Sequence, residues 1–439
     1  MLTPRVPVLL VLLAAPGLVT PWPWPWLAGV VGLLAVAVGL DLALAGSVAD
    51  LWAERAGDRR VRAGGTATVR LRVGNRGVRP VRGVIRDAWV PSAGARSTPD
   101  ATTPVTIEPG EAVEVVTELT PTRRGDRPAV RVTVRSYGPF GLAFRQTSRR
   151  RSRRLTPPWT LRVLAPFHSR RFLPEKLSRL RVIEGQVVVR GRGQGTEFDS
   201  LREYVVGDDV RSIDWRATAR AEHVMVRDWR PERDRRVLCV LDTGRTSAAR
   251  VGDEPRLDAA IDASLLLATL AIHAGDRVDL LAVDTQVRAS VSTGHRRSLP
   301  PALVDATATL TPALAETDFG RVVSEVCDRA RRRALVVLFT TLEPAALGEG
   351  LLPVLPRLLA RHRVVVASVT DPELTRLVTQ RGSVPDLYTA AAAARTLAAR
   401  QRVRAALVRH GVRVVEAPPE TFAAAVADAY LDLKAAGRL

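Results

Sequence analysis

Residues 6–40 near the amino terminus carry no charge and are mostly apolar. One membrane-spanning helix needs about 20 apolar residues, so this stretch is too long for one span and slightly short for two. The sequence TPWPWPW at 20–26 interrupts it, because alternating prolines remove backbone donors and disfavour helical geometry at the preceding residues. We therefore predict a transmembrane hairpin within residues 1–48, with helices at about 2–19 and 26–45 and tryptophans at the membrane surface.

Cations flanking the two predicted spans indicate their orientation, because Lys and Arg concentrate on the cytoplasmic side. Arg5 precedes the first span and the turn has no cation. Four arginines follow the second span: Arg55, Arg59, Arg60 and Arg62. We expect both ends, and everything after residue 45, to face the cytoplasm. The alternative is a cleaved signal peptide with its apolar core at 6–19, which would place the bulk of the chain outside the cell.

Apolar and polar residues alternate between residues 60 and 148, as in strands with one solvated face. Four valine-rich segments show this pattern, at 66–73, 81–90, 112–119 and 129–136. Gly and Pro turns separate them, which predicts a small all-β sandwich at 60–148, closed by YGPFGLAFR. We predict a linker at 149–194. It opens with RRRSRRL, which is either a contact for anionic lipid headgroups or a solvated connector.

The pattern changes after residue 235 to near-continuous apolar runs that alternate with helices. Such runs are typical of strands buried on both faces, and the helices show an apolar stripe. The predicted strands are 236–242, 276–284, 333–341, 362–371 and 412–418. The main predicted helices are 256–275, 319–332, 390–411 and 420–437, with a shorter one near 301–310. This order predicts a Rossmann-like, doubly wound, mostly parallel sheet within residues 195–439.

Composition narrows the function classes. The net charge is +20, and all but two of the 65 cations are Arg. A basic chain favours anionic lipid or nucleic acid, but no nucleic-acid-binding motif is present, so we expect no nucleic acid. Cys239 and Cys327 have no C-x-x-C spacing, which fits a reducing compartment. The six histidines have no metal-ligand spacing, and we expect no enzyme because no catalytic constellation is evident.

The stretch GTEFDSLREYVVGDDVRSIDWRATAR at 195–220 mixes charges of both signs with aromatic and aliphatic residues. We expect Phe198, Leu201, Tyr204 and Trp215 to anchor it to a core, with partly buried ion pairs around them. It is then a structural clamp or a surface that docks a partner, and an acid–base site is the third interpretation. The candidate residues are Glu197, Phe198, Arg202, Glu203, Tyr204, Gly207, Asp208, Asp209, Arg211, Asp214, Trp215 and Arg220.

This stretch, followed by HVMVRDWRPERDRRVLCVLDTGRT, resembles the signature of domain-of-unknown-function family 58. The apolar hairpin, YGPFGLAFR and the carboxyl-terminal YLDLK at 430–434 also match. The family consists of bacterial proteins with a von Willebrand factor A-like domain, often encoded beside MoxR-type AAA+ ATPases. The resemblance covers essentially the whole chain. It implies an α/β von Willebrand factor A-like fold, a bacterial inner or plasma membrane location and a MoxR-type ATPase as partner.

The resemblance also implies a Mg²⁺ site at the carboxyl end of the sheet, built from D-x-S-x-S, a loop Thr and a later Asp. Asp242 and Thr246 match the first motif, and Thr317 matches the loop Thr, with Asp318 as the alternative. Mg²⁺ prefers oxygen ligands, several of them water.

Two of the expected Mg²⁺ ligands are missing. Gly244 replaces the first Ser, and the run that begins at Thr340 lacks the later Asp. We therefore expect a degenerate site and no cofactor, with Mg²⁺ left as an alternative. Otherwise Asp242 caps a helix or pairs with Arg245, which then takes the place of the metal.

The function that follows is a membrane-anchored cytoplasmic adaptor or scaffold. Its A-like domain binds protein partners, and a MoxR-type ATPase or its client in cell-envelope assembly is the expected one. A secreted or surface adhesion module and an unrecognised enzyme are the alternatives. The oligomeric state is open.

Overall fold

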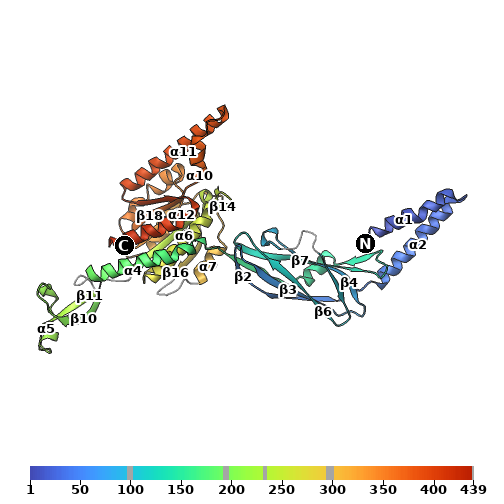
Figure 1. Ribbon diagram of the computed structural model, residues 1–439, viewed down its shortest axis with the longest axis horizontal. Coiled ribbons are helices and arrows are strands. Elements are labelled where there is room, and N and C mark those ends of the chain that lie inside the picture. The colour runs from blue at the N-terminus through green and yellow to red at the C-terminus, as the bar shows by residue number, and fades with distance from the viewer. Residues whose placement is uncertain (96–101, 191–196, 231–234, 293–300, 438–439) are drawn as a thin grey trace. The chain divides into compact units, whose positions relative to one another are not determined.

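The computed structural model describes residues 1–95, 102–190, 197–230, 235–292 and 301–437. Among these, it gives no account of the side chains of residues 186–190, 197–199 and 228–230. The chain divides into two compact units, Met1–Pro166 and Phe167–Leu439 (Figure 1).

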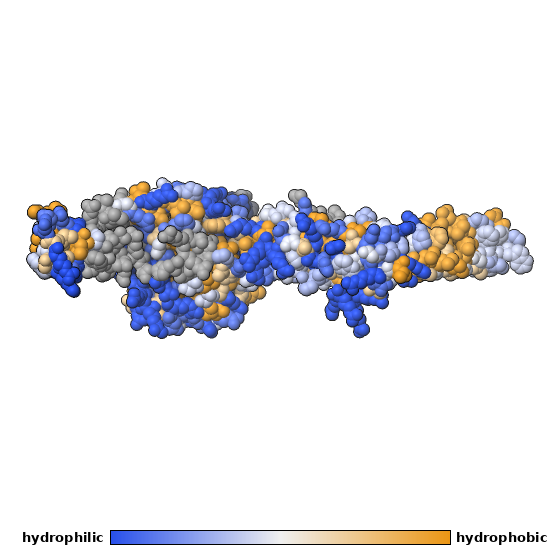
Figure 2. Space-filling model, turned by 90° about the horizontal axis from the view of Figure 1, so that it is seen from below, coloured by the Kyte–Doolittle hydropathy of each residue, from blue (hydrophilic) through white to orange (hydrophobic). Residues whose placement is uncertain are grey.

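The first unit begins with a helical hairpin. It consists of α1 (Arg5–Ala14) with the short η1 (Ala15–Val19), and α2 (Pro23–Leu44). Of the described helices, α2 alone is long and apolar enough to cross a membrane, and Arg5–Val19 is apolar but shorter. The structure thus supports one of the two predicted spans, α2, whereas the first, predicted at about 2–19, corresponds only to the shorter Arg5–Val19. Figure 2 shows apolar surface gathered over this hairpin.

The sequence suggested that the proline run at 20–26 lies outside the second helix, but the structure includes most of it in that helix. Helix α2 starts at Pro23 and takes the following Trp-Pro-Trp into its first turn. The first backbone N–H groups of a helix have no partner within it, so prolines there remove no hydrogen bond. The turn is therefore shorter than predicted. The indole of Trp26 donates to the carbonyl of Leu13 at 3.0 Å and joins the two helices.

The end of α2 is held by the YGPFGLAFR segment. Asp41, in the last turn of α2, is fully buried. Its Oδ1 accepts the backbone N–H of Phe140 at 2.8 Å, and its Oδ2 accepts those of Leu142 and Ala143 at 2.7 and 2.8 Å. The hydroxyl of Thr3 donates to carbonyls of the same loop. We call these contacts the Asp41 clasp.

Two sheets form the β-sandwich. One has the order β1 (Leu51–Gly57), β3 (Ala67–Asn75), β6 (Ala112–Leu119). The other has the order β2 (Arg60–Arg62), β9 (Thr160–Leu164), β7 (Gly125–Tyr137), β4 (Val81–Trp89), β5 (Thr103–Ile107), with β8 (Phe144–Gln146) beside β7. Aliphatic side chains from both sheets, such as Leu71 and Ile85, share one core. The predicted sandwich is present, and its strands extend to both sides of the predicted range 60–148.

The segment predicted as a linker at 149–194 is largely regular structure. It contains α3 (Arg149–Leu155), β9, η3 (His168–Phe172) and α4 (Leu173–Arg190). Leu161 and Val163 of β9 are fully buried, so this strand belongs to the sandwich. The arginine run hid a short pattern of alternating apolar residues. In the second unit, α4 lies on the last helix, where Lys176 pairs with Asp428 at 2.8 Å.

The second unit contains a six-stranded sheet. Its order is β16 (Val287–Ser292), β15 (Arg277–Val283), β12 (Arg236–Asp242), β17 (Leu335–Phe339), β18 (Arg363–Val369), β19 (Arg413–Ala417). Every pair is parallel except the one with edge strand β16. The helices are α6 (Arg256–His273), α7 (Pro301–Ala308), α8 (Phe319–Arg329), α9 (Leu355–Leu359), α10 (Pro372–Thr379), α11 (Val384–Arg409) and α12 (Pro419–Ala435).

The sheet is doubly wound, as predicted. From β12 the chain moves outward to β15 and β16, then returns to the other side of β12 to form β17, β18 and β19. The winding direction therefore reverses between β12 and β17. In open α/β sheets, ligands bind beyond the carboxyl ends of the strands at this switch point.

The 195–220 stretch forms a separate hairpin. Strand β10 (Glu197–Glu203) pairs antiparallel with β11 (Met225–Arg230), and the loop between them contains η4 (Val210–Ser212) and α5 (Trp215–Thr218). This two-stranded sheet is not part of the six-stranded sheet. We call it the β10–β11 hairpin (Figure 1).

Candidate functional site

Asp242 lies at the switch point of the six-stranded sheet, at the carboxyl end of β12. Its side chain is buried, and burial raises the pKa of its carboxyl, while hydrogen bonds from Thr317 and Thr340 lower it. Oδ1 accepts the N–H of Gly244 at 2.8 Å and the hydroxyl of Thr317. Oδ2 accepts the hydroxyl of Thr340 at 2.6 Å. The Thr246 side chain lies near enough to lower the pKa of this carboxyl as well.

The structure therefore brings together the three residues that the sequence singled out for a metal: Asp242, Thr246 and Thr317. It adds Thr340, which sequence analysis counted only as a missing Asp. Thr340 directly follows buried strand β17, whose carboxyl end lies beside that of β12. Its position after a predicted strand was therefore the signal in the sequence that could have placed it near Asp242. The neighbouring strand contributes Asp284, which accepts the Thr243 hydroxyl at 3.0 Å and Arg288 at 2.6 Å.

The protein already satisfies the Asp242 carboxylate. The described groups that could bind a metal are one carboxylate and three hydroxyls. Both oxygens of the carboxylate accept hydrogen bonds. A Cβ on Gly244 would lie 2.1 Å from the Thr317 hydroxyl oxygen, so the Ser of the metal-binding motif has no room beside this threonine. This donor set does not fit the metal-binding motif, because one hydroxyl and one carboxylate of its oxygen shell are missing and the negative charge is correspondingly lower.

Arg245 does not replace the metal, contrary to one expectation from the sequence. Its guanidinium pairs with Glu316, and both side chains are more than half exposed. Asp242 does not pair with Arg245, and its carboxylate accepts hydrogen bonds from threonine hydroxyls instead. Asp318, the alternative to Thr317, instead caps α8 by accepting the N–H of Arg321 at 2.9 Å.

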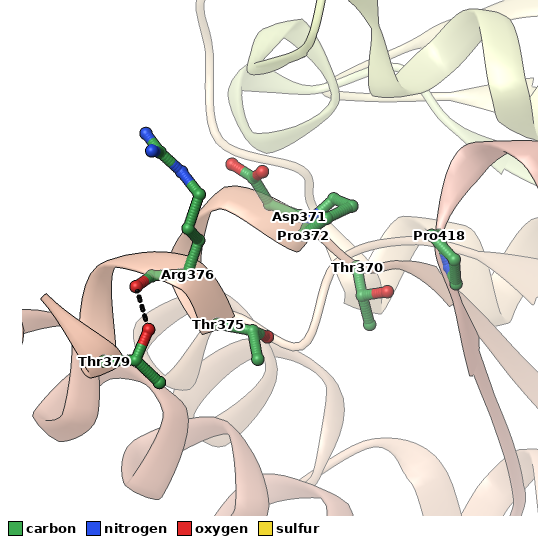
Figure 3. Close-up of a pocket in the computed structure, with 7 residues that line it drawn as sticks. All are labelled: Thr370, Asp371, Pro372, Thr375, Arg376, Thr379 and Pro418. Atoms are coloured by element: carbon green, nitrogen blue, oxygen red, sulfur yellow. Dashed lines mark hydrogen bonds between the residues drawn. The ribbon is translucent and has the colours of Figure 1, made fainter.

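A hollow of about 480 Å³ lies at the carboxyl ends of β18 and β19 (Figure 3). Its lining includes Thr370, Asp371, Thr375 and Thr379. Asp371 caps α10 by accepting the N–H of Glu373, and the Thr379 hydroxyl donates to a backbone carbonyl. The lining holds no nucleophile beside a general base, so its geometry supports no acid–base or nucleophilic mechanism.

Two ion pairs stabilise the β10–β11 hairpin from within. Arg202 binds Asp208 through two hydrogen bonds of 2.6 and 2.7 Å, and this partner, with the N–H of Val205, lowers the pKa of Asp208 to about 2. Asp214 caps α5 and pairs with Arg227 at 2.8 Å. Of the expected ion pairs, Arg202 with Asp208 joins two residues of the motif, and Asp214 pairs with Arg227 of β11; both connect parts of the hairpin to one another.

The remaining motif residues serve the loop or face solvent. Gly207 has a φ of +112°, which L side chains rarely adopt. Asp209 accepts the N–H of Arg211 at 2.9 Å and caps η4. Tyr204 is half-buried, whereas Glu203, Arg211 and Arg220 are exposed. Glu197 and Phe198 lie in β10, and their side chains are outside the described part of the chain.

Trp215 is not a core anchor, contrary to prediction. Its side chain is 69% exposed, and Leu201 is also exposed. Three valines of the same loop share this exposure: Val205 at 62%, Val206 at 94% and Val210 at 65%. We call Val205, Val206, Val210 and Trp215 the apolar tip.

The described residues define a mixed α/β protein with an apolar amino-terminal helix and a projecting, ion-paired hairpin. Residues 200–415 of the chain match the model of the family described as "Protein of unknown function DUF58". The matched range contains most of the β10–β11 hairpin and the sheet through β18.

Relatives with curated sequences are themselves uncharacterized. Uncharacterized protein Mb1516 of Mycobacterium bovis and Uncharacterized protein Rv1480 of Mycobacterium tuberculosis are each 28% identical over 185 residues, 41% of this chain and 56% of the relative. The chain thus spans little more than half the length of the curated relatives it matches.

Two of the solved structures that resemble this chain are distant likenesses. A FixG-related protein from Vibrio parahaemolyticus aligns at a TM-score of 0.17 and 9% identity over 26% of this chain and 96% of that one. A beta-glucosidase from Listeria innocua aligns at a TM-score of 0.13 and 14% identity over 22% of this chain and 15% of that one. Scores this low carry no argument about fold or function.

Proposed function

We propose that this protein is a membrane-anchored adaptor that presents the β10–β11 hairpin of a von Willebrand factor A-like unit to a protein partner on the cytoplasmic side. The expected partner is a MoxR-type AAA+ ATPase or its client, in cell-envelope assembly. Helix α2 supplies the anchor. The proposal assigns the protein no catalytic step and no cofactor.

The observation that carries the proposal is the exposed apolar tip on an ordered support. A Trp and three valines at 62–94% exposure are unusual on a surface that needs no partner, since clustered exposed apolar side chains mark interaction sites. Trp is also among the residues that dominate binding energy in interfaces. The two internal ion pairs hold the loop in one geometry, which lowers the entropy lost on binding.

The anchor supports the same proposal. Many apolar side chains of the helical hairpin are exposed, including Leu18 and Val19 of η1 at 88% each, and a bilayer would cover them. The Asp41 clasp ties this hairpin to the β-sandwich, so the anchor does not move independently of the first unit.

Crosslinking in cells tests the proposal. The full chain with Val206→Asp or Trp215→Ser should lose its crosslinked adduct with the MoxR-type ATPase, because each change removes apolar contact from the tip. The matched control is Val78→Asp, since Val78 is 92% exposed in the other unit, and it should keep the adduct. An adduct of equal yield in all variants, or no ATPase under any nucleotide condition, would contradict the proposal.

Orientation needs its own measurement. A reporter fused after residue 439 that is active only in the cytoplasm is the expected result. Activity only outside the cytoplasm would favour the alternative of a secreted or surface adhesion module. A hydrolytic activity that is lost in Asp208→Asn without loss of thermal stability would favour an enzyme.

A further inference from the structure

We propose that helix α3 binds anionic phospholipid headgroups of the bilayer in which α2 lies. This inference rests on the membrane anchoring in the proposed function and adds a lipid specificity to it. Helix α3 has the sequence RRRSRRL. All five of its arginines are exposed, while Ser152 and Leu155 are buried.

The local sequence disfavours this helix. Three arginines fill its first turn, where positive charge opposes the helix dipole. Arg149 and Arg153, and likewise Arg150 and Arg154, stand four residues apart, and like charges at this spacing repel. No ion pair joins any of the five to a residue in the described part of the chain, including Glu54 of strand β1, against which α3 packs. The five charges therefore lack a compensating partner within the described protein.

Tertiary contacts hold the helix in place. The Ser148 hydroxyl caps it, the Ser152 hydroxyl donates to the carbonyl of Val132, and Leu155 enters the sandwich core. The Thr156 hydroxyl accepts the N–H of Val132 at 2.9 Å. Tertiary contacts thus stabilise a helix whose exposed face carries positive charges without a neutralising partner among the described residues. An anionic surface opposite that face would supply the missing countercharge.

The bilayer is the anionic surface within reach. Helix α3 is fixed to β7 at Val132, five residues before the strand ends at Tyr137, and five strand residues span roughly 17 Å. The next residue, Gly138, abuts Asp41 at the end of α2. The guanidinium of Arg79 also reaches the carbonyl of Ala43 there. The arginine side chains extend from α3, and charges in solution interact over a Debye length of about 8–10 Å. The headgroups next to the end of α2 are therefore close enough to attract them.

Hydrogen exchange of residues 149–155 tests the proposal on the full chain in nanodiscs. In discs of phosphatidylcholine with phosphatidylglycerol, exchange should slow at least about fivefold relative to phosphatidylcholine alone, the effect of one arginine at an anionic surface. High salt should remove the difference. Arg150→Gln/Arg153→Gln/Arg154→Gln should weaken the lipid effect, because only Arg149 and Arg151 remain, and should slow exchange in phosphatidylcholine about twofold to fivefold by relieving repulsion.

The matched control is Arg331→Gln/Arg332→Gln/Arg333→Gln, an exposed arginine run in the second unit that should keep the lipid effect. Equal exchange in the two lipids, or equal slowing in both variants, would overturn the proposal. Inorganic phosphate that reproduces the slowing in phosphatidylcholine would overturn it too, since the ligand would then be a soluble anion. Carbonate extraction is done first: wild type that leaves the membrane refutes the anchor itself, whereas retained protein with no lipid effect refutes only the role of α3.

Discussion

Replacing Asp41 by Ala should unfasten the loop at 138–143 from helix α2. The substitution leaves three backbone N–H groups without their acceptor, those of Phe140, Leu142 and Ala143. A buried N–H that loses its acceptor costs about 1–3 kcal/mol. The N–H of Phe140 is only partly buried and can turn to water, so two groups carry the loss. We expect about 2–6 kcal/mol of destabilisation of the first unit.

Asp41→Asn separates the hydrogen bonds from the mere presence of a side chain. Leu142 and Ala143 both donate to Oδ2, so an amide with its oxygen there keeps these two bonds and loses only the one to Phe140. Its cost should therefore be smaller, about 1 kcal/mol or somewhat more. Asp50→Ala is the control, because Asp50 is exposed and close in sequence.

The assay is thermal unfolding of the full chain in nanodiscs, with hydrogen exchange of the Leu142 and Ala143 amides as the local readout. The expected order of stability is wild type and Asp50→Ala highest, Asp41→Asn lower and Asp41→Ala lowest. Equal amide protection in wild type and Asp41→Ala would show that the carboxylate does not hold the loop, and the reasoning would be refuted.

Three further predictions concern the second unit. Burial lowers the pKa of His362, whose ring nitrogens have no hydrogen-bond partner among the described residues. Below about pH 6.5 the unfolded chain therefore binds a proton that the native state does not, so the free energy of unfolding should decrease as the pH is lowered. His362→Leu should make the free energy of unfolding, measured by denaturant titration, depend less steeply on pH. Gly244→Ala should cost about 1–3 kcal/mol through its clash with Thr317, and less in a Thr317→Ala background; additive costs in that double-mutant cycle would exclude the clash. Lys434→Met leaves Asp276 buried without its cation and should cost about 3–5 kcal/mol, whereas adding Asp276→Asn should recover part of that; no recovery in calorimetry would count against the ion pair.

The sheet of the second unit was predictable because parallel strands are buried on both faces. Val237 to Leu241 of β12 are all buried, so the strand reads as an unbroken apolar run. The four Val-rich strands of the sandwich were predictable for a different reason, since one solvated face imposes strict alternation. Both signals are properties of single segments, and they locate strands without reference to the rest of the chain.

The candidate site was predictable only in part, because its geometry depends on contacts between distant segments. The motif placed Asp242 and Thr317 together, but only the pairing of β12 with β17 brings Thr340 to the same carboxylate. Trp215 was predicted in a core because aromatic residues usually mark one, yet its loop lies at the tip of a projection. Asp41 ends the long uncharged stretch, and a lone charge at a membrane helix was a signal that sequence analysis passed over.

The Asp41 clasp sets an order of events during synthesis. The carboxylate and the nearest of its three donors are 99 residues apart in the chain. At about 5–20 residues per second, a ribosome needs roughly 5–20 s to make that interval. Under the proposed anchoring, α2 would enter the membrane before the backbone N–H groups that bind Asp41 have been synthesised. Membrane insertion and completion of the sandwich would then be linked steps, and a chain truncated before residue 140 would lack all three partners of Asp41.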